Sequence, residues 1–335
     1  MMTTSTTMMS TSDRRAELEA AIDANMFDRS TYAVYADELQ RLGDPRGELI
    51  ALQMAPETPE TVERANRLIA EHGLAPPIRL SWKWGFVASV RLDPQPTTSL
   101  DHPSLRFLRL VSIAAVETGA QPAIDALASQ PRTALRGLNL GGGRLGATAC
   151  DLGVLDGLWS QLPNLEHLSL EGQNGSLGVL HLPKLTSLRI ASIALRDEPL
   201  SIVLDQEWTA LRMLGLSFGH ATPSPALLAR LFAHPFPELR RLDLAGNFLD
   251  DLIEPIVRWP GLPRLHHLRL SGGLTDRGAA SIAHHAKAFR RLPELDVSDN
   301  YLSPGTAGRL AEVVPEIKLG EQRAVDDRDL DLYDY

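Results

Sequence analysis

One apolar frame recurs along this 335-residue chain and constrains its fold more than any other feature. Apolar residues stand at positions one, four and six of the frame, as in LRRLDLAGN, which runs from Leu239 to Asn247. The frame starts are 30, 30, 20, 26, 28, 26 and 27 residues apart, at Leu105, Leu135, Leu165, Leu185, Leu211, Leu239, Leu265 and Leu292. So regular a spacing indicates a solenoid of one repeated unit, which buries its apolar side only when stacked on its neighbours.

The spacing inside the frame predicts a short strand in each copy. Positions four and six are two apart, so both side chains point to the same side of a strand, and stacked strands form a parallel sheet. Parallel strands need a crossover, and apolar residues at three- to four-residue spacing predict helices over 224–236, 275–289 and 303–314. The 20-residue step from Leu165 to Leu185 has no room for a full helix. The predicted fold class is α/β, with a concave parallel sheet and convex helices.

This arrangement resembles the leucine-rich repeats of the ribonuclease-inhibitor-like type. LRRLDLAGNFLDD and LPELDVSDNYLSPGTAGRL carry the resemblance best, and the solenoid is expected over 93–320. In that family an asparagine at position nine bonds the backbone of the turn, and successive copies form a ladder. Here position nine is asparagine only at Asn247 and Asn300. We therefore expect a broken ladder and irregular curvature through the first six repeats, with backbone or water hydrogen bonds taking its place where the asparagine is missing.

The preceding residues 13–92 hold no clear copy of the frame and predict a small helical module. Apolar spacing favours helices over 17–23, 32–42 and 59–72, with another beginning at Pro45. Gly43 suits the end of one helix, and Asp44 with Pro45 suits the start of the next. Trp82, Trp84 and Phe86 alternate, which predicts one strand that buries its aromatic side chains.

The segment YADELQRLGDPRGELIALQ, followed by LIAEHG and WGFVASVRL, resembles the repeat-companion domain of myxobacteria and planctomycetes. The resemblance implies a bacterial source and a module placed directly before leucine-rich repeats, and it implies no activity. We expect this module to cap the open amino-terminal end of the repeat sheet, because a solenoid exposes its core at both ends. VPEIKL, with Pro315, is expected to cap the other end.

The two chain ends are expected to lie outside the folded units. Residues 1–12 predict a disordered leader, and 321–335 form an acidic tail that ends in DDRDLDLYDY. A solvated tail is the simpler interpretation. The alternative is an acidic docking peptide anchored by Leu330, Leu332 and Tyr333.

Composition narrows the class of partner and the compartment. A net charge of −9 argues against nucleic acid or an anionic membrane surface as the main partner, since phosphate binding needs a clustered basic face. The single cysteine, Cys150, excludes an intrachain disulfide and favours a reducing compartment. No signal peptide or transmembrane stretch is recognisable, so a cytoplasmic location is expected.

No motif in the sequence makes a convincing case for catalysis. GGGRLG at 141–146 satisfies GxGxxG, but its glycines fall where a repeat turns, so no cofactor is expected. The pairs His266–His267 and His284–His285 lack the spacing of metal ligands, and no metal site is expected. The alternative to a non-catalytic binding protein is a target-selecting effector or enzyme subunit. Its chemistry would lie in a partner or in an unrecognised amino-terminal site.

Function is therefore expected on the concave face, where the third and fifth residues of each frame point outward. Arginine and aromatic side chains are common interface anchors, and the arginines here favour an acidic protein or peptide partner. The sequence does not predict the oligomeric state. The candidate contact residues are Phe107, Arg109, Asn139, His167, Arg189, Met213, Arg241, Asp243, His267, Arg269 and Asp296.

Overall fold

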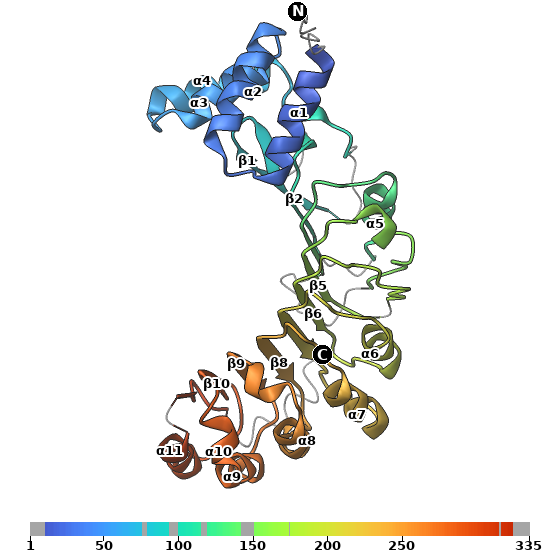
Figure 1. Ribbon diagram of the computed structural model, residues 1–335, viewed down its shortest axis with the longest axis vertical. Helices are drawn as coiled ribbons and strands as arrows, with labels where there is room; N and C mark the ends of the chain where they lie inside the picture. Colours follow the sequence, from blue (N-terminus) through green and yellow to red (C-terminus); the bar gives the residue numbers. More distant parts are fainter. Residues whose placement is uncertain are drawn as a thin grey trace, which may run out of the picture. The chain divides into compact units, whose positions relative to one another are not determined.

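A computed structural model describes residues 11–75, 79–93, 100–114, 119–141, 151–173, 175–314 and 316–323 of the chain (Figure 1). The chain divides into two compact units, which are described separately below. Unit 1 comprises Met1–Leu92 and Pro96–Val111, and unit 2 comprises the remainder, chiefly Ser112–Tyr335. Four predictions fall outside the described residues in whole or in large part: most of the leader, the GGGRLG motif with Cys150 nearby, the capping role of Pro315, and the acidic tail.

Unit 1 begins with helices that confirm the helical character predicted for this part of the chain. The described helices are α1 (Thr11–Ala24), α2 (Arg29–Arg41), α3 (Arg46–Met54) and α4 (Pro59–Glu71). Local signals fix their ends: the Asp28 carboxylate accepts from the Ser30 N–H before α2, and Thr58 forms a capping box with Thr61 before α4. Gly43, with φ of +72°, follows the end of α2 in the left-handed conformation that glycine tolerates.

A hairpin follows the helices, where the sequence predicted one strand. Strand β1 (Arg79–Lys83) pairs antiparallel with β2 (Phe86–Leu92). Trp84 and Gly85 have φ of 41° and 80°, so these two residues form a tight turn of the kind that joins hairpin strands. The Gly85 N–H donates to Gln53 Oε1 at 2.8 Å, which holds the turn against α3. The prediction of a continuous strand through Trp84 is therefore wrong.

The core of unit 1 is aromatic. Tyr35, Phe86 and Phe107 pack in mutual ring contact, and the Tyr35 hydroxyl donates to Glu19 Oε1 at 2.6 Å. Burial raises the pKa of Tyr35, and the bond to Glu19 adds to the effect. Phe107 belongs to the segment Pro96–Val111, so this unit extends past Leu92, where the sequence placed the module's end.

Unit 2 contains a long parallel sheet whose strands follow one another in chain order. After β3 (Leu110–Ile113), which spans the division between the units, each neighbouring pair from β4 to β11 is parallel. The strands are β4 (Gly137–Gly141), β5 (His167–Glu171), β6 (Ser187–Ala191), β7 (Met213–Ser217), β8 (Arg241–Ala245), β9 (His267–Ser271), β10 (Glu294–Asp296) and β11 (Ile317–Lys318). From β4 to β10, frame positions four and six are buried, as the two-residue alternation requires.

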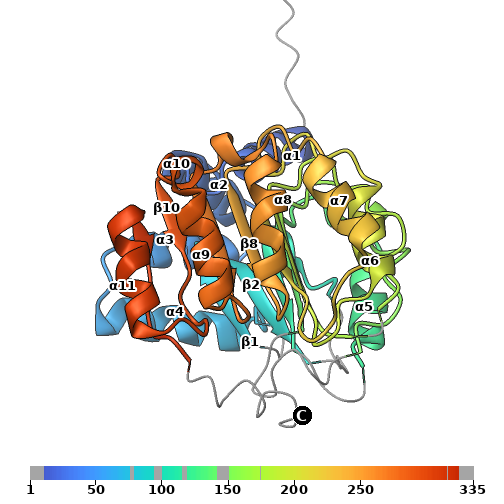
Figure 2. The same ribbon diagram turned by 90° about the horizontal axis from the view of Figure 1, so that it is seen from below.

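The connections place helices along one face of this sheet (Figure 2). The α-helices are α5 (Gln121–Ala128), α6 (Asp197–Leu204), α7 (Pro225–Ala233), α8 (Ile253–Arg258), α9 (Asp276–His284), α10 (Ala286–Phe289) and α11 (Pro304–Val313). Short 3-10 turns are η1 (Pro103–Leu105) in unit 1, and η3 (Trp159–Gln161), η4 (Leu249–Leu252) and η5 (Leu262–Arg264) in unit 2. The three predicted crossover helices are confirmed, and the described residues between β5 and β6 contain no helix.

The first copy of the frame is shifted by three residues from its predicted place. Strand β3 starts at Leu110, and Val111 and Ile113 are its buried residues. The frame therefore begins at Leu108 rather than Leu105, which lies in η1. The shift has a physical reason, because Phe107 is 4 % exposed and packs in the aromatic core instead of pointing outward.

The expected ladder is incomplete, and one of its two asparagines does not belong to it. Asn300 is fully buried and bonds backbone groups of its own turn and of the preceding repeat. Asn247, at the same frame position, is exposed. Backbone bonds join the turns in its place, with the Gly246 N–H donating to Ser271 O at 3.1 Å. The sequence predicted such substitution where the asparagine is missing, but not in this copy, which carries Asn247.

Candidate binding surface on the concave face

The outward side chains of unit 2 form two rows, named here row three and row five after their frame positions. Neighbouring strands pair in register, so each row crosses the sheet one residue per strand. Row three is Gly137, His167, Ser187, Met213, Arg241, His267 and Glu294. Row five is Asn139, Ser169, Arg189, Gly215, Asp243, Arg269 and Asp296. Nine of the eleven candidate residues lie in these rows. Their role in binding remains a prediction.

Phe107 and Arg109 do not belong to this surface. Phe107 is in the core of unit 1, and Arg109 is 11 % exposed. The Arg109 guanidinium donates to the carbonyls of Ile22 at 3.2 Å and Asp23 at 2.7 Å, near the carboxyl end of α1. A cation at that end of a helix is favourable, since the last carbonyls have no partner within the helix. The sequence-based assignment of these two residues to the concave face is corrected accordingly.

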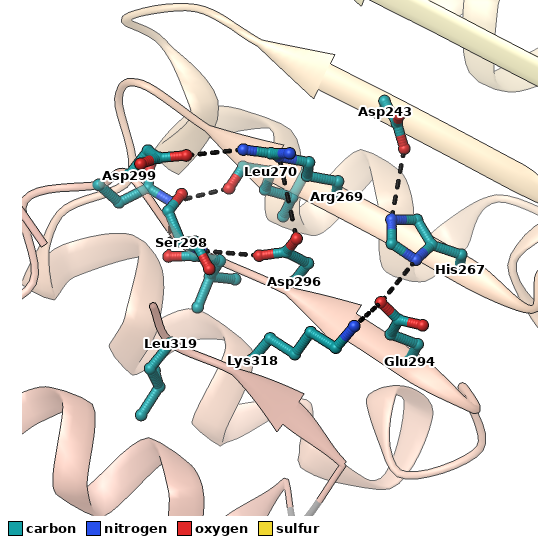
Figure 3. A network of polar contacts seen from close by, with 12 residues as sticks. Asp243, His267, Arg269, Leu270, Glu294, Asp296, Ser298, Asp299, Lys318 and Leu319 are labelled. Carbon is teal, nitrogen blue, oxygen red and sulfur yellow. Dashed lines mark hydrogen bonds and ion pairs between the residues drawn. The ribbon is translucent and has the colours of Figure 1, made fainter. Parts of the chain in front are cut away.

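A network of charged side chains covers the surface from β8 to β11 (Figure 3). Arg241 binds both carboxylate oxygens of Asp243, with its Nε 3.0 Å from each. His267 is 13 % exposed and lies between two acids, with Nδ1 3.0 Å from Glu294 and Nε2 3.5 Å from Asp243. Lys318 Nζ donates to Glu294 at 2.6 Å, which extends the network to the last described strand.

The second half of the network surrounds Arg269. Its guanidinium donates to Asp299 at 2.6 Å and has Nε 3.9 Å from Asp296 (Figure 3). Burial acts to raise the pKa of Asp296, but hydrogen bonds from Ser298 and the charges of Arg269 and His267 outweigh it and hold that pKa below its usual value. The hydrogen bond from Lys318 likewise lowers the pKa of Glu294. The acids at this end of the sheet are thus neutralised by the protein itself.

Substituting Asp296→Asn should lower stability at pH 7 by about 1 kcal/mol, the scale of one lost charged contact. Because the pKa of Asp296 is depressed in the folded state, its contribution is complete above the unfolded pKa near about 4 and is lost as pH falls further. The difference in urea midpoint between wild type and variant should therefore shrink from pH 6 to pH 3. A difference that is constant over this range would contradict the proposed role of the charge.

A hollow of about 160 Å³ opens in the concave face over β6 to β9. Gly215 lines it together with small residues of the same strand and of the next two strands, namely Ser217, Ala245 and Ser271. A Cβ atom on Gly215 would stand 3.4 Å from the side chains of Arg189 and Met213, so neither crowding nor a left-handed backbone demands glycine here. The hollow exists because this position carries no side chain. Gly215 occupies an outward fifth position of its frame, but it is not among the contact residues expected from the sequence.

The chemistry available on this face is recognition through hydrogen bonds, charge and shape. Among the described residues, no three His, Cys, Asp or Glu side chains are grouped as a metal site requires. The Asp296–Asn300 turn faintly resembles a calcium loop, but its polar groups bind other groups of this chain. Asp296 accepts from the Ser298 N–H at 2.9 Å, and Asp299 pairs with Arg269. No helix in the described part of the chain is long and apolar enough to cross a membrane.

Comparison with known proteins identifies a structural neighbour. The crystal structure of a Bacteroides fragilis protein, solved by a structural genomics consortium, superimposes with a TM-score of 0.63 and 22% identity, covering 68% of this chain and 70% of that one. No family model and no curated protein matches the sequence. At this identity the likeness concerns the fold alone. Together with the parallel sheet and its regularly placed helices, it supports an α/β fold of repeated, solenoid-like units.

Proposed function

We propose that this chain is a leucine-rich-repeat protein with an amino-terminal companion module, and that it binds a protein partner on the concave face without catalysing a reaction. The module precedes the repeats in sequence, where a solenoid needs a cap, and the single cysteine favours the cytoplasm. The observation that carries the proposal is the register of rows three and five. It sets side chains from seven successive strands, β4 to β10, on one face.

The dimensions of this face favour a macromolecular partner. Strands about 4.8 Å apart give rows roughly 29 Å long from β4 to β10, which suits a protein interface of standard size. The hollow at Gly215 is about 160 Å³, below the roughly 300–1,000 Å³ that encloses most small ligands. A hollow of this size instead accommodates one protruding side chain of a larger partner.

Gly215→Phe provides the test, because the phenyl ring fills the hollow and the substitution leaves the charge unchanged. Gly215 does not have the left-handed backbone conformation that would require glycine. Immobilised wild-type protein is expected to retain one stoichiometric partner from a lysate of its source, and the variant is expected to lose at least about tenfold in affinity, the effect of about 1.4 kcal/mol. Ala226→Phe is the matched control, since Ala226 is exposed on α7 on the helical side of the sheet.

Two results would contradict the concave-face proposal. The first is a partner retained equally by wild type and Gly215→Phe. The second is a partner lost with Ala229→Phe but not with Gly215→Phe. Ala229 lines a different, apolar groove of about 570 Å³ between α7 and α8, near Phe232 and Trp259. That result would move binding to the helical face.

A further inference from the structure

We infer that the partner segment on this face is acidic and extended, and that its carboxylates bind Arg189, which lines the Gly215 hollow, and Arg212, which directly precedes the strand of Gly215. The inference rests on the proposed function and adds the chemistry of the partner. The observation behind it is that some arginines on and directly before β6 to β8 are paired with acids of this chain, whereas others are not. Arg189 and Gly215 are paired in register on adjacent strands, so the cation stands directly beside the hollow.

Cations outnumber acids on these three strands. The outward positions of β6, β7 and β8, with the residue that precedes each strand, contain four arginines and one acid. The acid is Asp243, which Arg241 already binds through both carboxylate oxygens. Arg240 has a long contact of 3.4 Å to Glu238 and donates to the Leu239 carbonyl at 3.1 Å.

The other two arginines have little or no internal counter-charge. Arg189 is 57 % exposed, and its nearest acid, Glu171, is 3.8 Å away, beyond hydrogen-bond distance. Arg212 is exposed and forms no hydrogen bond or ion pair through its side chain with any described residue. Both guanidinium groups are therefore available for the bidentate geometry in which arginine recognises a carboxylate.

The placement of Arg212 beside Arg240 gives an energetic reason for a carboxylate to bind here. The Arg240 N–H donates to the Arg212 carbonyl at 2.9 Å, so the two residues are neighbours across β7 and β8. Like charges on adjacent strands are mutually destabilising unless a counter-charge lies nearby. A carboxylate of a bound segment supplies that counter-charge, so binding relieves a repulsion that is present in the free protein.

The remaining strands limit where such a segment lies. On β10, Glu294 and Asp296 are matched by Lys318 and Arg269, so this end presents neutralised acids and no spare cation. An acidic segment therefore gains charge contacts over β6 to β8 and none toward β11. Side chains two apart in an extended segment point the same way, so alternating acids reach the surface together. A long phosphate polymer fits less well, because its continuous charge meets the acids of β10.

Selection from a phage-displayed library of random dodecapeptides on the full chain tests the inference. We expect enriched sequences that carry acids at alternate positions. A synthetic copy of the most enriched peptide should lose at least about tenfold in affinity when its acids are exchanged for amides, and equally when Arg189→Glu and Arg212→Glu are combined. The matched control combines Arg258→Glu with Lys287→Glu, which reverses two exposed cations on α8 and α10 and should change affinity less than about twofold.

Gly215→Phe separates this inference from the function on which it rests. Enrichment of neutral or basic peptides that bind the wild type but not Gly215→Phe would support binding on the concave face. It would contradict the preference for acidic peptides. Failure to enrich any peptide, or binding that Gly215→Phe leaves unchanged, would overturn both. A twelve-nucleotide oligothymidylate that binds as tightly as the peptide, and is weakened by the same arginine reversals, would assign the face to phosphate and overturn the acidic-peptide partner.

Discussion

Replacing Asn300 by alanine is expected to lower the free energy of unfolding of unit 2 by about 3 kcal/mol, because several buried hydrogen bonds depend on one side chain. Asn300 Nδ2 donates to the carbonyls of Leu270 at 2.7 Å and Val297 at 2.9 Å. Its Oδ1 accepts from the N–H groups of Gly273 at 3.1 Å and Leu274 at 2.9 Å. Alanine would remove these four bonds in a site that is fully buried, where a backbone polar group that loses its partner is costly.

Asn247→Ala is the matched control for this prediction. It removes the same side chain from the same frame position, but Asn247 is exposed, so a change within about 0.5 kcal/mol is expected. Urea unfolding gives the two free energies, and hydrogen exchange of peptides covering 270–302 locates the loss. Equal effects of the two substitutions would show that Asn300 does not have the ladder role described here.

The loss should also reach the candidate binding surface. Asp299 precedes Asn300 and pairs with Arg269, and the Asp299 carbonyl accepts from the Gly272 N–H at 3.1 Å. A turn loosened by Asn300→Ala would release Arg269 from its acid. Exchange should therefore increase in β9 together with the turn, whereas α6 and β6, three repeats away, should change little, since each repeat contacts mainly its neighbours.

The two asparagines illustrate what the sequence predicts and what it does not. Their frame positions are identical, and the periodicity that locates them also predicts the parallel sheet and the crossover helices. Whether the side chain points inward depends on the adjacent turn: Phe248 is buried after Asn247, and backbone bonds of Gly246 and Gly272 join these turns. The spacing of three apolar residues does not show whether the asparagine side chain or backbone bonds will join the turns.

The first repeat shows a second kind of ambiguity. LRFLRLVSI contains two overlapping frames, one from Leu105 and one from Leu108, and both satisfy the spacing. Packing of Phe107 against Tyr35 and Phe86 selects the second, and the contact with Tyr35 joins residues more than seventy positions apart in sequence. Spacing alone therefore placed Phe107 and Arg109 on the wrong surface, although it identified the remaining outward positions.

The chemistry of the candidate site was the least predictable part. The sequence shows arginines and acids on the same strands, but their pairing depends on side-chain conformations. Arg241 and Arg269 were natural choices for partner contacts, yet both bind acids of this chain. Reversing their charge would disturb internal ion pairs as well as any interface. Arg189 and Arg212 are cleaner probes, and only the structure distinguishes them.

Gly47→Ala in unit 1 is expected to cost about 3 kcal/mol, since overpacking against rigid backbone has a large penalty. A Cβ atom at Gly47 would stand 2.6 Å from the Ala36 carbonyl oxygen and 2.7 Å from the Gln40 nitrogen, because α3 passes this close to α2. Both atoms belong to helical backbone, so the clash requires the helices to separate. The GDPRGE corner is thus a structural element that brings two helices into contact.

The neighbouring residues of the corner support this interpretation. The Arg46 guanidinium donates to the Asp44 carboxylate and lies over the Phe86 ring at 5.8 Å. Burial acts to raise the pKa of Asp44, but the bonds and charge of Arg46 prevail and lower it. Arg46 is therefore used inside the fold, whereas Glu48 forms only an exposed pair with Arg64. An amino-terminal catalytic role for the corner gains no support from these contacts.

Two other glycines test the reason for the Gly47 effect. Gly43 has φ of +72° and open space around its Cβ position, so alanine there should cost only the backbone strain, about 1 kcal/mol. Gly308 lies in helix α11 with open space and an ordinary φ, so alanine should stabilise by up to about 1 kcal/mol. Urea unfolding would measure the three effects, and hydrogen exchange of α2 and α3 would locate the loss caused by Gly47→Ala. If Gly47→Ala costs no more than Gly43→Ala, close helix packing is not what requires glycine in this corner.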